Sequence, residues 1–391
     1  MRGEEPDRAC YNDPNLGFYY KSDFHWSRMM GERAKRLIEK FGLDYLPREF
    51  NAIIDERHMY MNRQILFACR TSEDVSRIGE IGDFYCLTGI MPSHEKIHLG
   101  TLAVVESMKA FQKKAKLTII LVADLEALAT RGIPLDIGRK YALEYHIPTY
   151  IALGLNPDKT IFYFQSENVD LQKIAFDAAK EITLSEFRAV YGDANPPRIV
   201  SVLHQIGDML FPQLVEPMYG IIPVGLDQDP HIRLCRDYLK RTKVYNFKPI
   251  VGVYIRDVPS LDGRGKMSKS EPHKAIFIPE DNYKMLRRKI FKAFSGGAPS
   301  LEEQRRKGAD LSKDVPYKIL EFILKDEKQL RKIARDYSTG KMISGEIKEF
   351  LFEYLRSFME DFKEKLEQAR ELVRANDIVL IRSKEDLKAI I

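Results

Sequence analysis

The chain has 391 residues, of which 44% are hydrophobic and 30% are charged, a composition typical of globular proteins and unlike that of disordered or fibrous chains. Its longest apolar runs are too short to span a bilayer, and its charged N-terminus lacks the apolar segment of a secretory signal. The four cysteines lie far apart without a CxxC pair, so we expect no protein-held metal, no membrane and a cytoplasmic location.

The net charge is +5, and the whole excess lies in residues 281–391. Two basic clusters, Arg287-Arg288-Lys289 and Arg305-Arg306-Lys307, belong to this segment. A positive surface suits a phosphate backbone, because neutralised phosphates release counterions. An excess of this size is also common in helical domains that bind no nucleic acid, so the charge alone does not decide between the two.

The first 80 residues carry few periodic signals. Residues 1–35 are rich in aromatic side chains, and residues 50–80 indicate short extended pieces followed by a helix from about Ser72. We therefore treat residues 1–80 as an N-terminal extension with an appended segment.

From Asp83 onward, strands and helices are predicted to alternate. Phe84–Leu87 predicts a short strand that runs into a Gly/Pro loop, and a helix is expected from His98 to about Lys114. Leu117–Ala123 is a continuous apolar run, as in a strand buried on both faces of a parallel sheet. Further strands are expected at Thr160–Phe164, Gly220–Val224 and Pro249–Tyr254. This succession predicts an α/β fold, a Rossmann-like doubly wound parallel sheet over residues 81–280.

The pattern changes near residue 280. Strand signals disappear after Glu280, and amphipathic helices are expected from Tyr283 on. We place a domain boundary here, which makes residues 281–391 an all-helical C-terminal domain.

The first segment with chemical content is Thr88-Gly-Ile-Met-Pro-Ser-His-Glu-Lys-Ile-His98-Leu-Gly100-Thr101. It lies between a predicted strand and a predicted helix, where ligands of such sheets bind. Gly89 and Gly100 lack Cβ atoms and allow a nucleotide to approach the backbone. The N–H groups at the start of the helix suit phosphates, and the His98 imidazole can donate a hydrogen bond to them. A capping or packing role for His98 is an equal alternative.

The second segment is Leu261-Asp-Gly-Arg-Gly-Lys266-Met-Ser-Lys269-Ser270. Lys266 and Lys269 can place ammonium groups on a polyphosphate, and the glycines give the loop mobility. Taken alone, the segment also fits a solvated basic turn.

Together and in this order, the two segments resemble the HIGH and KMSKS signatures of class I aminoacyl-tRNA synthetases. In that family the two loops hold ATP, with its Mg²⁺, while the carboxylate of the amino acid attacks the α-phosphate. The chemistry rests on positioning and charge neutralisation rather than on an enzyme nucleophile. The resemblance implies that His98, Thr101, Lys266 and Lys269 are catalytic. It also implies an ATP site made of Gly89, His98, Gly100, Asp227, Lys266, Met267, Ser268, Lys269 and Ser270.

The segment Gly220-Ile-Ile-Pro-Val-Gly-Leu-Asp227-Gln-Asp-Pro-His-Ile-Arg-Leu-Cys-Arg-Asp237 narrows the resemblance. It is similar to the tryptophanyl-tRNA synthetases of the archaeal and eukaryotic type, as are Ala293-Phe-Ser-Gly-Gly297 and the stretch 336–348. The resemblance implies that the substrates are tryptophan, ATP and tRNA. It also implies a homodimer formed through a helical insertion at about residues 105–215, and C-terminal helices, with Arg287, Arg288 and Lys289, that bind the anticodon stem.

The same resemblance implies roles around the amino acid. Asp227 would contact the ribose of ATP, and Gln228 would hold the polar head of the amino acid. Glu126 stands where the family has a glutamate near the substrate. Asp208, which follows Gln205 in a QxxD pattern, is similar to the aspartate that accepts the indole N–H in bacterial tryptophanyl enzymes. For Asp227 and Glu126 the alternative is a helix cap, for Gln228 a backbone bond, and for Asp208 an exposed helix carboxylate.

Three positions depart from the family pattern. Thr101 replaces the second histidine of the HIGH element. Leu87 and Leu121 replace the tyrosine and glutamine that read the polar atom of the substrate ring in archaeal and eukaryotic tryptophanyl enzymes. Because a buried indole N–H without a partner costs about 1–3 kcal/mol, either Asp208 supplies the acceptor or the substrate differs. A tyrosine–tRNA ligase, a paralogue with altered or lost aminoacylation, and a nucleotidyltransferase with an HxGH-type fold therefore remain alternatives.

Overall fold

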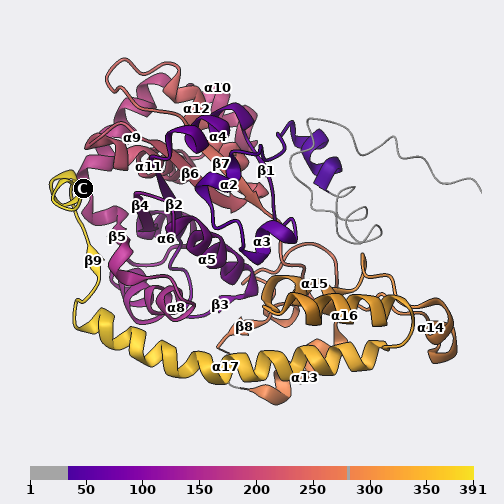
Figure 1. The fold of residues 1–391 in the computed structure, drawn as a ribbon. Coiled ribbons are helices and arrows are strands. Elements are labelled where there is room, and N and C mark those ends of the chain that lie inside the picture. Colours follow the sequence, from indigo (N-terminus) through magenta and orange to yellow (C-terminus); the bar gives the residue numbers. More distant parts are fainter. Residues whose placement is uncertain (1–33, 280–281) are drawn as a thin grey trace, which may run out of the picture.

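The computed structural model describes residues 34–279 and 282–391, and its centre is a seven-stranded sheet with the strand order β1-β7-β6-β2-β4-β5-β9 (Figure 1). All neighbouring strands run parallel except β1, which is antiparallel to β7. The seven strands are β1 (Leu66–Cys69), β2 (Phe84–Ile90), β4 (Leu117–Val122), β5 (Thr160–Phe164), β6 (Tyr219–Gly225), β7 (Ile250–Ile255) and β9 (Val379–Leu380). The predicted α/β class with a doubly wound parallel sheet is confirmed.

Side chains along each strand alternate between two cores, one on each face of the sheet. In β2, Phe84 and Cys86 enter one core, whereas Tyr85 and Leu87 enter the other. Helices α5 and α8 cover the first face, and α9, α11 and α12 cover the second. This alternation follows from the period of two in an extended chain, and burial on both faces explains the continuous apolar runs.

The helices of the first 280 residues connect the strands. Besides a helical stretch at residues 34–41, the described part contains α2 (Phe50–Ile53), α3 (Met59–Asn62), α4 (Ser72–Ile81), α5 (Leu99–Gln112), α6 (Asp124–Arg131), α7 (Leu135–Tyr141), α8 (Ile147–Ala152), α9 (Val169–Glu181), α10 (Leu184–Tyr191), α11 (Pro196–Leu210) and α12 (Asp229–Leu239). A π turn, Ala142–His146, joins α7 to α8 without a break. The helix expected from about Ser72 is confirmed as α4, and the one expected from His98 begins one residue later as α5.

Two strand predictions need correction. The strand predicted to end at Leu87 continues to Ile90, because residues 87–90 pair with residues 119–122 of β4. The prediction that strands end at residue 280 is wrong, since β9 pairs in parallel with β5 at the edge of the sheet. Val379 and Leu380 were hidden from periodicity because two residues are too few to show it. A separate two-stranded ribbon, β3 (Ile97–His98) with β8 (Phe277–Ile278), joins the start of α5 to the segment that follows residue 270.

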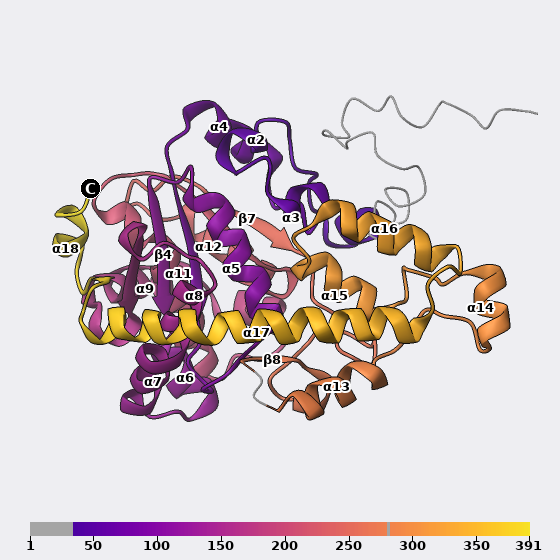
Figure 2. The same cartoon turned by 60° about the horizontal axis from the view of Figure 1, so that its bottom comes forward.

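Beyond residue 281 the chain is helical until β9. The helices are α13 (Tyr283–Lys292), α14 (Leu301–Lys307), α15 (Val315–Ile323), α16 (Glu327–Ser338), α17 (Ser344–Arg374) and, after β9, α18 (Lys384–Lys388). Helix α17 runs from the helical part back along α8 to the sheet (Figure 2). The division of the chain at residues 80 and 280 stays a prediction.

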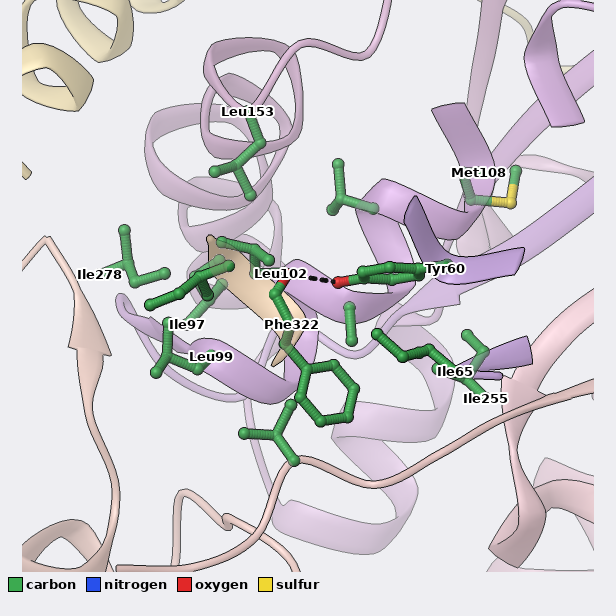
Figure 3. Close-up of a cluster of buried hydrophobic side chains, with 14 of the residues drawn as sticks. Tyr60, Ile65, Ile97, Leu99, Leu102, Met108, Leu153, Ile255, Ile278 and Phe322 are labelled. Atoms are coloured by element: carbon green, nitrogen blue, oxygen red, sulfur yellow. Dashed lines mark hydrogen bonds between the residues drawn. The ribbon is translucent and has the colours of Figure 1, made fainter. Parts of the chain in front are cut away.

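The helical part shares a core with the sheet part. Phe322 of α15 belongs to the same apolar cluster as Tyr60, Leu102 and Ile255, and the Tyr60 hydroxyl donates to the Phe322 carbonyl at 3.2 Å (Figure 3). Burial of each large apolar side chain stabilises the fold by about 1.5–3 kcal/mol, so this contact fixes the two parts against each other. Of the helices in the described part of the chain, none has the length and apolar character that a membrane span requires.

Candidate active site

One cavity of about 830 Å³ lies at the carboxyl ends of the parallel strands β2, β4, β6 and β7, the expected ligand position in a doubly wound sheet. Its lining includes every residue that the sequence assigned to ATP or to the amino acid. These are Leu87, Gly89, His98, Gly100, Thr101, Glu126, Gln205, Asp208, Asp227, Gln228, Lys266, Met267, Ser268, Lys269 and Ser270. The structure thus brings the two motif segments, which are more than 150 residues apart in sequence, around one space.

His98 is the N-cap of α5. Its Nδ1 accepts the N–H of Gly100 at 3.0 Å, and burial together with the charges of Lys269 and Lys266 lowers its pKa to about 4. The ring is therefore neutral at pH 7, with its proton on Nε2, and this N–H is the donor that His98 can offer to a ligand. The capping and ligand-binding alternatives for His98 are compatible, since each uses a different ring nitrogen.

The N–H groups at the start of α5 are less free than the sequence predicted. The Leu99 N–H donates to the Ile276 carbonyl at 3.1 Å, and the Gly100 N–H is taken by His98. The β3–β8 ribbon causes the first of these bonds, because it places residues 276–278 beside the helix start. The prediction that these N–H groups are open to phosphates is wrong for Leu99 and Gly100.

Gly100 is required by the ring that caps the helix. A Cβ at this position would lie 2.6 Å from the His98 Cε1 atom and 2.8 Å from Nδ1, so any other residue would displace the imidazole. At Gly89 a Cβ would lie 3.3 Å from the Leu121 side chain, which is a tight contact. Because glycine has no Cβ, the strand backbone at Gly89 stays open toward the cavity. Both glycines keep backbone and ring close to the place where a nucleotide would bind.

The second motif forms a loop that folds back on itself. Gly263 and Gly265 have positive φ angles of 74° and 104°, and the Gly265 carbonyl accepts the N–H of Ser260. Met267 is buried and its N–H donates to the Val258 carbonyl at 3.0 Å, which anchors the loop behind β7. The Ser268 and Ser270 hydroxyl oxygens lie 2.8 Å apart. These contacts present Lys266 and Lys269 to the cavity.

The two lysines are in different surroundings. Lys266 is exposed and its Nζ lies 2.8 Å from an Asp227 carboxylate oxygen, so this ion pair joins the loop to the end of β6. The Gln228 amide donates to the same carboxylate at 3.0 Å. Lys269 is largely buried, and desolvation lowers its pKa to about 8. An anion that entered the cavity would therefore meet a desolvated ammonium group.

Carboxylates and amides form the opposite end of the cavity. The Gln205 amide donates to Glu126 at 3.0 Å, and burial raises the pKa of Glu126. Asp208 is fully buried and accepts from the Tyr163 hydroxyl at 3.0 Å and from the Gln165 amide. Burial, offset in part by these bonds, raises its pKa to about 7. The exposed-carboxylate alternative for Asp208 is therefore wrong.

The walls near Asp208 are apolar. Leu87, Leu121, Met209 and Ile222 line the cavity there, so this end combines an apolar slot with one polar end group. Such a combination suits a flat, largely apolar side chain that carries one polar atom.

Sequence reasoning missed several residues of this site. His146 and His231 line the cavity, as do Arg131 and Tyr150, while Tyr163 and Gln165 fix Asp208. His231 stands inside the recognised 220–237 segment and contacts the Tyr191 hydroxyl at 2.9 Å, so the motif could have indicated it. Tyr163 pairs with Leu121 in the β4–β5 register, a contact that no local pattern reveals.

The three basic residues assigned to tRNA lie outside the cavity, on α13. Arg287 is exposed, lies 2.6 Å from Glu349 and covers the Phe291 ring at 4.1 Å. Arg288 is exposed, whereas Lys289 donates to the Ala275 carbonyl at 3.0 Å and lies over the Phe277 ring. Only part of this cluster thus faces solvent.

Two further features of the described residues concern metal ligands and cysteines. Among residues 34–279 and 282–391, no group of three His, Cys, Asp or Glu side chains is arranged to hold a metal ion. Cys69, Cys86 and Cys235 are buried free thiols, and Cys10 and the aromatic N-terminal residues lie outside the described part.

Comparison with known proteins gives one answer. Residues 81–360 match the family described as tRNA synthetases class I (W and Y). The chain is 36% identical over 348 residues to the tryptophan–tRNA ligase of Methanocaldococcus jannaschii, covering 86% of this chain and 93% of that protein. It is 34% identical to the tryptophan–tRNA ligase of Hyperthermus butylicus, with 89% and 95% covered. The crystal structure of tryptophanyl-tRNA synthetase from Aeropyrum pernix superposes with a TM-score of 0.83 at 31% identity, over 91% of this chain and 98% of that one.

These matches span nearly the whole length of the relatives and include both motif segments, the sheet and most of the helical part. The chain therefore belongs to the class I tRNA synthetases of the tryptophan and tyrosine family.

Proposed function

We propose that the chain activates tryptophan with ATP and transfers it to tRNA, as a tryptophan–tRNA ligase. The observation that carries the proposal is that His98 and Lys269 line the same cavity as the apolar slot that Asp208 closes. Relatives named tryptophan–tRNA ligase, at 30–36% identity, favour tryptophan over tyrosine.

The geometry suggests how the first step proceeds. A carboxylate oxygen of tryptophan attacks the α-phosphorus of ATP, and the bond to pyrophosphate breaks in line with it. Lys266, Lys269 and the Nε2–H of His98 would stabilise the charge that develops on the phosphate oxygens, and Mg²⁺ would enter with the ATP. Asp227 would exchange its bond with Lys266 for the ribose hydroxyls. A ribose hydroxyl at the 3′ end of tRNA would then attack the carbonyl carbon and release AMP.

The amino-acid end suggests how tryptophan is selected. With a pKa of about 7, Asp208 is about half ionised at pH 7. In its ionised form the carboxylate still has free lone pairs beside its bonds with Tyr163 and Gln165, so it can accept the indole N–H that Leu87 and Leu121 cannot bond. Gln205, Glu126 and Gln228 would hold the ammonium and carboxylate groups of the amino acid.

Pyrophosphate exchange tests this proposal. Purified protein with ATP should exchange pyrophosphate when tryptophan is added and much less with tyrosine. Asp208→Asn should raise the KM for tryptophan by about tenfold or more, because a charge-assisted hydrogen bond is replaced by a weaker one, and leave the KM for ATP unchanged. Exchange with tyrosine alone would favour the tyrosyl alternative, and ATP binding without any adenylate would favour the paralogue.

The tRNA would bind the helical part through the exposed arginines of α13. Because Arg287 also pairs with Glu349, Arg288→Glu is the cleaner charge reversal. It should weaken tRNA binding and lower the slope of log K against log salt by about one, while pyrophosphate exchange stays as in the wild type. An unchanged tRNA affinity would remove Arg288 from the binding surface.

We further propose that the active form is a cytoplasmic homodimer. Val169 and Phe176 of α9 and Val200 of α11 are large apolar side chains exposed on two helices that pack together, and Phe176 is 78% exposed. Leu184, at the start of α10, is exposed as well. Such a patch is typical of an interface. Phe176→Asp should convert the dimer to a monomer in sedimentation analysis.

The proposed cytoplasmic location agrees with the buried free thiols, which are typical of a reducing compartment.

A further inference from the structure

The helix that runs from Leu135 to Ala152 contains a π turn at Ala142–His146, and the turn has a local cause. Pro148 lacks a backbone N–H, and its ring would clash with the carbonyl of the residue four positions earlier, which is Glu144. The helix accommodates this by widening for one turn. A π turn rotates the residues that follow it, and here the last residue of the turn is His146.

The π turn directs His146 into the cavity described above. The ring is 2% exposed and lines the cavity together with Tyr150, one turn further on. Its Nε2 lies 2.6 Å from the His94 carbonyl oxygen. Because a carbonyl only accepts, Nε2 carries the proton, and burial, with the nearby charge of Lys269, lowers the pKa of His146 to about 3. The ring is thus a neutral donor with an unprotonated Nδ1.

The bond to His94 reaches a segment that has little regular structure. Residues 91–96 connect β2 to β3, the strand that ends at His98, and Ser93 and His94 line the cavity. The Ser93 N–H donates to the Met91 carbonyl and the Lys96 N–H to the His94 ring, so these two bonds stay within the segment. His146 supplies a bond from outside it, on the side of the cavity.

The outer side of the π turn is held by the long helix. Arg370 of α17 donates through Nε to the Glu144 carbonyl at 3.1 Å, the same carbonyl that Pro148 leaves without its helical partner. The Arg370 guanidinium also lies over the Tyr145 ring at 5.6 Å. Through Arg370, helix α17 therefore holds the π turn that carries His146 in place.

We propose that His146 is a positioning residue for the nucleotide: by holding the His94 carbonyl it keeps segment 91–96 and the adjoining His98 in place around ATP, and Arg370 fixes the π turn from behind. The proposal rests on ATP as the occupant of the cavity. It makes His146 part of the activation site although the residue belongs to neither motif.

The test compares two substitutions of similar size. His146→Leu fills the space without an N–H, whereas the amide of His146→Gln can still donate to the His94 carbonyl. In calorimetric titration with ATP alone, His146→Leu should raise the Kd by about fivefold or more, since it leaves a buried carbonyl without its donor, and His146→Gln should stay within about threefold of the wild type. The KM for tryptophan should not change in either variant.

Matched controls separate positioning from general destabilisation. His58→Leu removes a half-buried histidine outside the cavity lining, whose Nε2 lies 3.4 Å from a Glu106 carboxylate oxygen. It should lower the melting temperature without changing the Kd for ATP. Arg370→Ala should weaken ATP binding in the same direction as His146→Leu. Arg356→Ala, on the same helix but paired with Glu353 and Glu360, should not.

Some outcomes would overturn the proposal. A folded His146→Leu protein that binds ATP like the wild type would do so, as would an effect that only follows the loss of melting temperature seen in His58→Leu. Should the leucine variant fail to fold, His146→Asn, whose shorter amide does not reach the carbonyl, takes its place with the same expectation. ATP titration needs no amino acid, so it decides this proposal even if tryptophan-dependent exchange is absent and the proposed function fails.

Discussion

Lys269 is a cation whose charge depends strongly on its burial. Burial lowers its pKa to about 8 in the free protein, against 10.5 for an ordinary lysine. Between these two pH values the unfolded chain binds more protons than the folded one, so the desolvation of Lys269 disfavours the folded state below pH 8, and this cost shrinks as the pH rises from 8 to 10.5. A triphosphate would reverse the effect locally, because an adjacent anion favours the charged form of the amine.

This linkage predicts a pH dependence of ATP binding. The Kd for ATP should be nearly constant from pH 6.5 to 7.5 and should rise above pH 8, by at most about tenfold per pH unit, as Lys269 must take up a proton to bind the phosphates. Lys269→Arg keeps its charge up to pH 12 and should remove this rise. Titration calorimetry in buffers of different ionisation enthalpy measures the proton uptake directly. A wild-type Kd that stays flat to pH 9.5 would contradict the role of Lys269.

At the scale of single residues, the sequence predicts the groups that belong to motifs and misses those that tertiary contacts supply. Lys266, Lys269 and His98 stand in local patterns that hold whatever the rest of the chain does. Gln165 and Tyr163 fix Asp208 only because β5 lies beside β4 and α11 packs over both. His146 had a local signal, the proline two residues later inside a helical pattern, but that signal says nothing about which cavity the ring would enter.

Helix α5 shows what an element contributes that its residues alone do not. Its first turn must accommodate the His98 ring above Gly100, and the β3–β8 ribbon fixes where that turn begins. The existence of the helix follows from its apolar periodicity. Its exact surroundings depend on residues 277–278, some 180 positions away in the sequence, and could not be predicted locally.

Two glycines in equivalent helix positions test this arrangement. Gly100 and Gly345 are each the second residue of their helix, but a Cβ would strike the His98 ring in the first case and meet open space in the second. Gly100→Ala should lower kcat/KM for ATP in pyrophosphate exchange by about 10- to 100-fold, because it displaces a group that binds the transition state. Gly345→Ala should leave exchange unchanged and keep or slightly raise stability. Equal kinetics in the two variants would show that the capping ring takes no part in activation.

Across the whole molecule, the C-terminal residues close the chain onto the sheet. After α17, strand β9 pairs with β5, and Ile381 and Leu387 are buried in the core on the α9–α11 face. The sequence predicted the sheet, the positions of β4, β5, β6 and β7, the start of β2, and the helical C-terminal part. It did not predict this return, because pairing of a two-residue strand depends on the free edge of β5 rather than on any pattern in residues 376–391.

A pair of substitutions in residues 376–391 measures how much the packing of this segment against the sheet stabilises the fold. Leu387→Ala should lower the free energy of unfolding by about 2–5 kcal/mol, as for other fully buried leucines. Ile390→Ala, three residues later and 43% exposed, should change it by less than about 0.5 kcal/mol. Denaturant titration gives both values. A similar small change in both variants would mean that the segment is not part of the cooperative unit.

The position of β9 has a mechanical consequence. The helices between β7 and β9 leave the sheet from one strand and rejoin it at the far edge, with β6, β2, β4 and β5 in between. A body attached at two separated points cannot swing as on a single tether, and its easiest motion is a rotation about the line that joins the attachments. A load applied to these helices from outside would therefore reach the sheet as a torque across six of its seven strands, from β7 to β9.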